Sequence, residues 1–200
     1  MIKSRHRKHR NGRRFLSFRE YLTIFEATPD NVRQDQYEAM KSLKCPAYLC
    51  GRTAPENLNL ISYGQLDDLH DTPEGVNAIV NCCKVILGVD EPAIMAERAD
   101  RILGFVAFCN KEVKRINKLF ASISPDFEPE EKMAGIEKLR FGSFGILDWY
   151  SRRMGITDQD EVRRVPWVRI WQCMRNDNET GKYEKRLRAV YKRQNKIRKK

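Results

Sequence analysis

Apolar residues recur at every third or fourth position along most of the chain, which is the spacing that lines one face of an α-helix. No two segments alternate apolar and polar residues around a turn signal, so the sequence predicts no strand pair. The expected fold is therefore all-α. The predicted helices lie over residues 15–25, 31–43, 63–70, 73–87, 91–123 and 129–154, then a short stretch after 157, 166–174 and 182–198.

Residue types at the ends of several segments support these boundaries. Ser62 and Gln65 stand three residues apart, as in a capping box at a helix start. Gly88 is the residue type that commonly ends a helix. The prolines, glycine and asparagines of 44–62 predict an extended loop. Residues 176–181, which also include asparagines and a glycine, predict a turn.

The longest predicted helix, 91–123, carries apolar residues at alternating steps of four and three over four heptads, as a coiled-coil seam does. Further apolar residues (Leu103, Phe105, Phe108 and Leu119) widen this surface, which is typical of the central helix of a bundle. The pattern favours an internal bundle and leaves an oligomer seam as the alternative. The residues predicted to meet a partner helix are Met95, Ile102, Val106, Val113, Ile116 and Phe120.

Charge divides the chain into a body and two extensions. The formal net charge is +11, yet the cations gather at the ends and leave 15–181 slightly acidic. This distribution of charge, with the helix-breaking segment Ser124–Pro129, predicts four parts of the chain. They are a basic arm over 1–14, a helical bundle over 15–123, a C-terminal helical subdomain over 124–181 and a basic helix over 182–200.

Cationic ends of this kind attract phosphate backbones or acidic protein surfaces, although charged ends can also be merely solvated. In the final helix, Leu187, Val190, Tyr191 and Ile197 fall on one side and the cations elsewhere. The predicted contact residues for nucleic acid or an acidic partner are Lys3, Arg5, Arg7, Lys8, Arg10, Arg13, Arg14, Lys185, Arg186, Arg188, Lys192, Arg193, Lys196, Arg198, Lys199 and Lys200.

Candidate chemistry is sparse. The phosphate-binding glycine loops, the zinc-protease helix motif and the serine nucleophile elbow are all absent from the sequence. The six cysteines are irregularly spaced, which favours buried small hydrophobes in a reducing compartment over a zinc site. His70 with Asp67, Asp68 and Asp71 could bind a cation, but a solvated helix end is favoured. We expect no enzyme activity, no cofactor and no metal.

Two further patterns bear on partners. No stretch reaches about 18 consecutive apolar residues, so no membrane span is predicted.

Aromatic residues of the second half fall on helical faces beside aliphatic ones, which favours core packing over stacking on bases. Glycines 142 and 145 among them indicate either close helix approach or a break. The aromatic set is Phe141, Phe144, Trp149, Tyr150, Trp167, Trp171 and Tyr183.

Small, aromatic and Pro-Trp positions recur with a common rhythm between residues 75 and 191. They are Ala134-Gly135, the run Phe141 to Gly155, Val162, Pro166-Trp167-Val168 and Tyr183 to Leu187. This rhythm resembles small helical morphogenesis proteins of tailed bacteriophages, notably the tail-assembly-chaperone type and head–tail proteins. The resemblance implies helical faces that bind other proteins and implies no catalytic residues. Cationic ends depart from the chaperone pattern and point instead to a connector or internal virion protein near DNA or an acidic portal surface.

These observations predict a non-enzymatic structural or assembly protein of a tailed bacteriophage, located in the virion or the host-cell cytoplasm. It would be a head–tail connector, an internal virion protein or a tail-assembly component, and an oligomer. Its partners would be other virion or assembly proteins, with DNA or acidic protein at the basic ends. The alternative is a free basic nucleic-acid-binding protein outside any virion.

Overall fold

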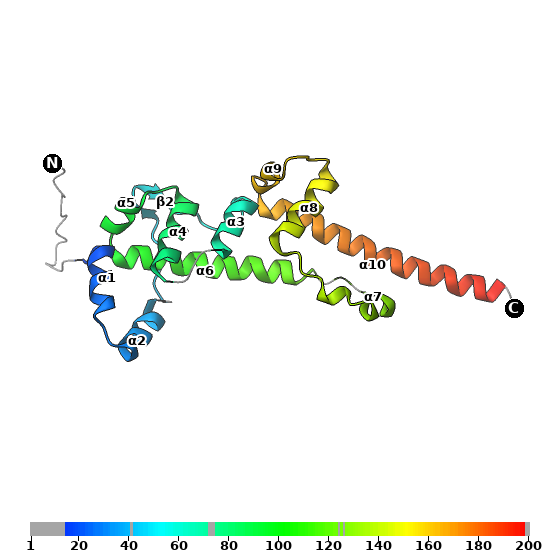
Figure 1. Ribbon diagram of the computed structural model, residues 1–200, viewed down its shortest axis with the longest axis horizontal. Helices are drawn as coiled ribbons and strands as arrows, with labels where there is room; N and C mark the ends of the chain where they lie inside the picture. Colours follow the sequence, from blue (N-terminus) through cyan, green and yellow to red (C-terminus); the bar gives the residue numbers. More distant parts are fainter. Residues whose placement is uncertain (1–14, 41, 72–74, 124, 126, 199–200) are drawn as a thin grey trace. The chain divides into compact units, whose positions relative to one another are not determined.

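The structure is a computed structural model that describes residues 15–40, 42–71, 75–123, 125 and 127–198. Over these residues it contains ten α-helices, one 3-10 helix and one two-stranded sheet, so the predicted predominance of helix is confirmed (Figure 1). Among the helices described, none combines the length and apolar character needed to cross a membrane.

The chain folds into two compact units that do not follow chain order. Unit 1 comprises 1–56 and 71–111, and unit 2 comprises 57–70 and 112–200. This division differs from the predicted limits of 15–123 and 124–181, because residues 57–70 and 112–123 belong to the same unit as the C-terminal part of the chain.

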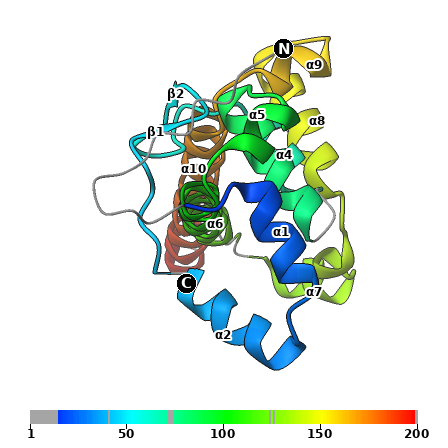
Figure 2. The same ribbon diagram turned by 90° about the vertical axis from the view of Figure 1, so that its left-hand side faces the viewer.

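Unit 1 is built from short helices that pack on one another. Helices α1 and α4 both contact α5 (Figure 2). Its core is formed by fully buried side chains from five elements, which are Phe18, Leu49, Cys83, Ile94, Ile102 and Phe105. The helices and strands of unit 1 are α1 (Phe18–Glu26), α2 (Asp30–Met40), β1 (Tyr48–Leu49), β2 (Arg52–Thr53), α4 (Val76–Leu87), α5 (Glu91–Ala96) and the first half of α6 (Ala99–Ala121).

The ends of α1 and α4 show why these segments are helical. Ser17 and Glu20 form a reciprocal capping box at the start of α1. At the C-terminal end of α4, Gly88 adopts the left-handed conformation (φ 62°), as its position in the sequence predicted.

The antiparallel pair β1–β2 corrects the prediction of an irregular loop without strands. Its register pairs Leu49 with Arg52 and leaves Cys50 and Gly51 as a two-residue turn. Both turn residues have positive φ (49° and 76°), which is what a type I′ hairpin turn requires. With only two residues in each strand, no alternation of apolar and polar residues was visible in the sequence.

The predicted helix over 91–123 is also wrong as a single element, because it breaks between α5 and α6. Glu97 is extended there (ψ 163°), and its carbonyl accepts a 2.7 Å hydrogen bond from the Phe18 amide. The Ala99 amide donates in turn to the Leu16 carbonyl at 3.0 Å. These backbone bonds to a distant segment replace helical ones, so Met95 lies on a different helix from the other five predicted seam residues.

Unit 2 is assembled around the start of α10. The Tyr63 amide donates to the Val165 carbonyl at 2.8 Å, and the Trp167 amide donates to the Ile61 carbonyl at 3.2 Å. Fully buried residues form its core: Leu58, Ile116, Tyr150, Val162, Trp167 and Ile170. The elements are α3 (Tyr63–His70), the second half of α6, α7 (Pro129–Met133), a 3-10 helix (Ile136–Lys138), α8 (Gly142–Met154), α9 (Gln159–Arg163) and α10 (Trp167–Arg198).

Helix α3 begins as predicted and packs closely on α9. Ser62 and Gln65 make both bonds of the capping box, at 2.9 and 3.1 Å. A Cβ on Gly64 would lie 3.0 Å from the Arg163 carbonyl oxygen, so only glycine fits there without displacing α9. The Arg163 guanidinium bridges Asp67 and Asp68 of α3 at 2.7 and 2.6 Å.

Two further helix predictions in unit 2 are corrected. The predicted helix over 129–154 is interrupted, because positive φ is adopted by Gly135 (84°), which follows α7, and by Gly142 (57°), the first residue of α8. The turn predicted at 176–181 is absent, since α10 runs unbroken through these residues. An ion pair at 2.9 Å between Arg153 of α8 and Asp177 ties this stretch of α10 to its own unit.

Candidate binding surface on the C-terminal helix

Helix α10 begins in the core of unit 2. Trp167 is 1% exposed, and its indole N–H donates a 2.7 Å hydrogen bond to the Leu58 carbonyl. The Trp171 indole donates to the Leu119 carbonyl at 2.9 Å. The buried Trp167 ring and the half-buried Trp171 ring, each with its N–H satisfied, fix the direction of the start of the helix.

The other end of α10 is exposed. Every side chain from Arg188 to Lys196 is exposed, as is that of Ile197. These last turns extend away from the other elements of unit 2 (Figure 1). The helix therefore offers about ten residues of accessible surface without burying them in its own unit.

Apolar side chains form a stripe along this exposed end. Tyr183, Leu187, Val190 and Ile197 follow one another at helical steps, with Gln194 completing the row. We call these five residues the C-terminal stripe. Its solvent exposure is high, with Tyr183 at 56%, Val190 at 47% and Ile197 at 75%. Tyr191, at 55%, lies beside it.

The predicted cationic contact residues of α10 divide into paired and unpaired groups. Lys185 pairs with Glu128 at 3.4 Å, and Arg188 approaches Glu184 at 3.9 Å. Within the described part of the chain, no ion pair is formed by four of the others, which are Arg186, Lys192, Arg193 and Lys196.

The remaining predicted contact residues fall outside what the structure describes. Arg198 is the last residue of α10, but its side chain is not described. The N-terminal set and the last two lysines lie outside the described residues: Lys3, Arg5, Arg7, Lys8, Arg10, Arg13, Arg14, Lys199 and Lys200.

Helix geometry separates the paired cation from the stripe. At 3.6 residues per turn, Lys185 lies on the side of α10 opposite Tyr183 and Gln194. Lys185 faces Glu128 of its own unit, so the C-terminal stripe faces away from that contact. Arg186 and Arg193 border the stripe along one edge. The exposed end thus combines an apolar row with unpaired positive charge, which is the surface of a basic amphipathic helix.

The predicted seam on α6 is partly enclosed in the chain itself. Ile102 and Ile116 are fully buried, the first among unit 1 residues and the second among unit 2 residues. Val106, Val113 and Phe120 are half-buried, and the Phe120 ring lies 6.0 Å from that of Trp167. Ile102 and Ile116 are therefore not accessible to a partner helix.

Three predicted aromatic roles are corrected. Phe141 and Phe144 are 68% and 61% exposed, so they do not pack the core, whereas Tyr150 and Trp167 do. A Cβ on Gly145 would lie 2.5 Å from the Phe141 Cβ, so the glycine is needed for Phe141 to sit against α8. Tyr183 is also exposed and belongs to the C-terminal stripe.

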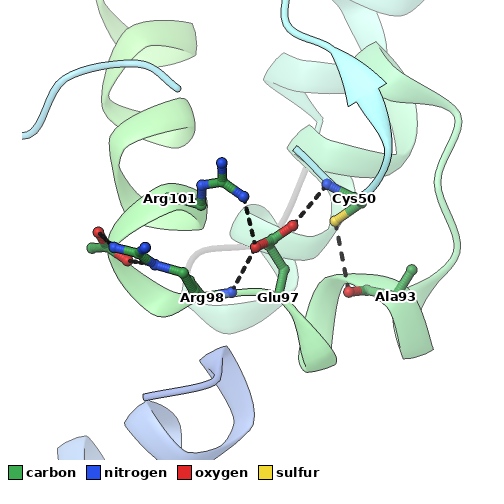
Figure 3. Close-up of polar contacts among 6 residues, drawn as sticks. Cys50, Ala93, Glu97, Arg98 and Arg101 are labelled. Carbon is green, nitrogen blue, oxygen red and sulfur yellow. Dashed lines mark hydrogen bonds and ion pairs between the residues drawn. The ribbon is translucent and has the colours of Figure 1, made fainter. Parts of the chain in front are cut away.

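The Glu97 carboxylate is the centre of a polar cluster in unit 1 (Figure 3). The Glu97 carboxylate accepts the amides of Cys50 and Arg98, each at 3.0 Å, and an Arg101 guanidinium bond at 3.4 Å. Burial by itself raises the pKa of Glu97, but the bonds from Arg98, Cys50 and Arg101 outweigh it and hold the pKa below its usual value. These bonds leave the carboxylate anchored rather than reactive.

Three cysteines of unit 1, which are Cys50, Cys83 and Cys109, are poor nucleophiles. Burial, with the nearby carboxylates Glu97 and Asp90, raises the pKa of Cys50 to about 11, and burial raises that of Cys83 further. A hydrogen bond with Cys82, together with burial, raises the pKa of Cys109. Because their pKa values are raised, these thiols remain protonated at neutral pH. Only a thiolate attacks as a nucleophile, so they are unreactive. Over the described residues, no group of three histidine, cysteine or acidic side chains is arranged to hold a metal ion.

The acidic residues near His70 have other roles. The carboxylates of Asp67 and Asp68 bind Arg163, and the His70 ring lies 3.0 Å from the Asn117 side-chain oxygen. These contacts join α3 to α9 through Arg163 and to α6 through Asn117, all within unit 2.

Comparison of the chain with protein family models, with curated proteins and with solved structures finds no match. Residue roles therefore rest on the geometry of this chain alone. The feature that this geometry isolates is the exposed end of α10. Its apolar row from 183 to 197 was visible in the spacing of the sequence, but the predicted turn at 176–181 concealed that the row belongs to a helix anchored in the core.

Proposed function

We propose that this chain is a non-enzymatic structural or assembly protein of a tailed bacteriophage that binds its neighbours through helical faces and basic ends. The observation that carries the proposal is the exposed end of α10, where apolar side chains and unpaired cations occupy about three helical turns. The bacteriophage assignment comes from the sequence resemblance. The surface chemistry supports binding rather than catalysis.

The exposed end is suited to association. Arginine, lysine, glutamine and alanine favour helix, and cations near a helix C-terminus are stabilised by the helix dipole. An isolated helix is nevertheless marginal in water, because most helical stability in proteins comes from burying an apolar face. A partner that covers the C-terminal stripe would supply that burial.

Two parts of the chain would carry out this function. A helical bundle with a long central helix would present faces to neighbouring subunits, while a C-terminal helical subdomain would carry the basic helix. The basic arm over 1–14 and the helix over 182–200 would contact DNA or acidic protein in the virion or in the host-cell cytoplasm.

Quantitative mass spectrometry of gradient-purified particles from the source organism tests this function. A fixed copy number that is a multiple of six or twelve is expected for a ring or connector component. Presence in the lysate with absence from particles would identify an assembly factor that leaves. A source that yields no particles would overturn the proposal.

A second candidate is a free nucleic-acid-binding protein, which is favoured by the four unpaired cations of α10. Contact with about 6–10 phosphates would make affinity for DNA fall by roughly 10³–10⁵ between 50 and 200 mM salt. Deletion of 1–14 and 182–200 should then abolish binding. A flat salt dependence would remove this candidate.

A further inference from the structure

The C-terminal stripe and the charges along it together define the chemistry of a partner. We infer that the exposed end of α10 binds an acidic amphipathic helix of another protein, which packs on Tyr183, Leu187, Val190 and Ile197. This inference rests on the proposed function and specifies one of its partners.

The exposed apolar area favours a protein over a nucleic acid. Phosphate contacts are made by cations and hydrogen-bond donors and gain nothing from valine or isoleucine. Val190 and Ile197 are 47% and 75% exposed, and they lie in one row with Leu187 and Tyr183. Covering aliphatic side chains in a row is how one amphipathic helix recognises another.

The row has the register of a coiled coil. Steps of four, three, four and three separate residues 183, 187, 190, 194 and 197, which places them at alternating d and a positions. Gln194 occupies an a position, where a polar side chain fixes register and orientation. Arg186 and Arg193 take the flanking g positions, where charge selects the partner.

A second copy of this chain is a poor occupant. In a parallel pair, the g position at Glu179 would face the e position at Glu184 of the other copy. An antiparallel pair would bring the g positions together, which are Arg186 and Arg193. Like charges therefore meet in both arrangements, and they disfavour self-association.

An acidic helix satisfies the same positions. Glutamate or aspartate flanking its apolar row would face Arg186 and Arg193, and a polar residue would face Gln194. Neither arginine has a described carboxylate within ion-pair distance, so an incoming acid would replace no described ion pair. Lys185 is already paired with Glu128 on the far side of the helix.

The test uses the full chain and a synthetic four-heptad peptide with leucine at a and d, one asparagine at a central a position, and glutamate at e and g. A matched peptide with lysine at e and g and a short DNA duplex serve as controls. Fluorescence anisotropy at two salt concentrations gives the affinity for each probe. Circular dichroism confirms that each variant keeps its helix content.

Two double variants separate the apolar stripe from overall charge. Val190→Ser with Ile197→Ser removes apolar area from exposed positions, where serine has a helix propensity close to that of valine and isoleucine. Lys192→Gln with Lys196→Gln removes two cations away from the stripe. We expect the first to weaken binding of the acidic peptide by at least about tenfold and the second by less than about threefold.

Two results would overturn the inference. One is equal affinity of the wild type and the Val190→Ser, Ile197→Ser variant for the acidic peptide. The other is tighter binding of the wild type to the DNA duplex, with both variants losing affinity only in proportion to charge. The proposed phage function fails on a different result, the absence of particles, so the two failures are distinguishable.

Discussion

The two ends of helix α10 differ in their exposure to solvent. At its start, Trp167 and Ile170 are buried and the Trp167 indole donates to the Leu58 carbonyl at 2.7 Å. At its end, Val190 and Ile197 stand in solvent. One continuous helix thus belongs to a folded core over its first turns and to a binding surface over its last.

This difference separates two sources of helical order. Burial of a large side chain with its polar atom satisfied stabilises a helix together with everything packed on it. The exposed end depends on propensity and on charge near the helix C-terminus, each of which contributes a few tenths of a kcal/mol per residue or pair. Substitutions at the start should therefore affect folding, and substitutions at the end should affect association.

The largest expected effect follows from removing the anchor. Trp167→Ala should lower the free energy of unfolding of unit 2 by about 3–5 kcal/mol, because it leaves a cavity and an unpaired Leu58 carbonyl. Urea denaturation monitored by circular dichroism measures the change. A loss below about 1 kcal/mol would contradict the central place of Trp167 in the core.

Glu97 provides the next effect and a pH test in unit 1. Glu97→Gln should lower the free energy of unfolding by about 1–3 kcal/mol at neutral pH, since it weakens the bonds from Cys50, Arg98 and Arg101.

The lowered pKa of Glu97 fixes the sign of the pH dependence. Its stabilisation is complete above the unfolded-state pKa of about 4.3 and is lost as pH falls through the lower folded-state value. Wild type and Glu97→Gln should therefore converge in stability at acidic pH. Thermal unfolding across pH 2–7 tests this, and parallel curves would refute it.

Two glycines in unit 2 offer a smaller, matched comparison. No neighbouring atom lies within 4 Å of a Cβ added at Gly181 or Gly155, but only Gly155 has positive φ (68°). Gly181→Ala should raise the free energy of unfolding by about 0.5–1 kcal/mol, and Gly155→Ala should lower it by about 1 kcal/mol. Changes of the same sign would mean that α10 is interrupted near 181.

The smallest expected effect on folding is at the other end of α10. Deleting 188–200 should change the free energy of unfolding by less than about 0.5 kcal/mol, because the described side chains removed are exposed. The same deletion should abolish binding of an acidic helical peptide. Thermal unfolding and anisotropy on the same sample measure both, and a large loss of stability would place this segment in the folded core.

Local signals predicted individual elements well where the chemistry was local. The capping box of Ser62 and Gln65, the stop at Gly88 and the amphipathic face of 76–87 were all visible as residue spacings and are present in the structure. Prediction was wrong where distant residues decide. The helix predicted over 91–123 breaks where the Phe18 amide donates a hydrogen bond to the Glu97 carbonyl, and no residue near 97 in the sequence indicates that bond.

The same reason explains the candidate surface. The apolar and cationic positions from 183 to 197 follow from the sequence, since periodicity depends only on residue order. Whether those side chains are buried depends on where the helix is anchored, and that is decided by Trp167 and by the unbroken path through 176–181.

The sequence by itself determined that this chain is mainly helical, that its cations lie at its ends and that its last helix is amphipathic. These properties follow from composition and spacing, which act over three or four residues. Only the tertiary structure decided that 57–70 join the C-terminal part, that α5 and α6 separate at Glu97 and that the stripe on α10 stays uncovered. Each of these depends on hydrogen bonds and packing between residues far apart in the chain, which no local pattern encodes.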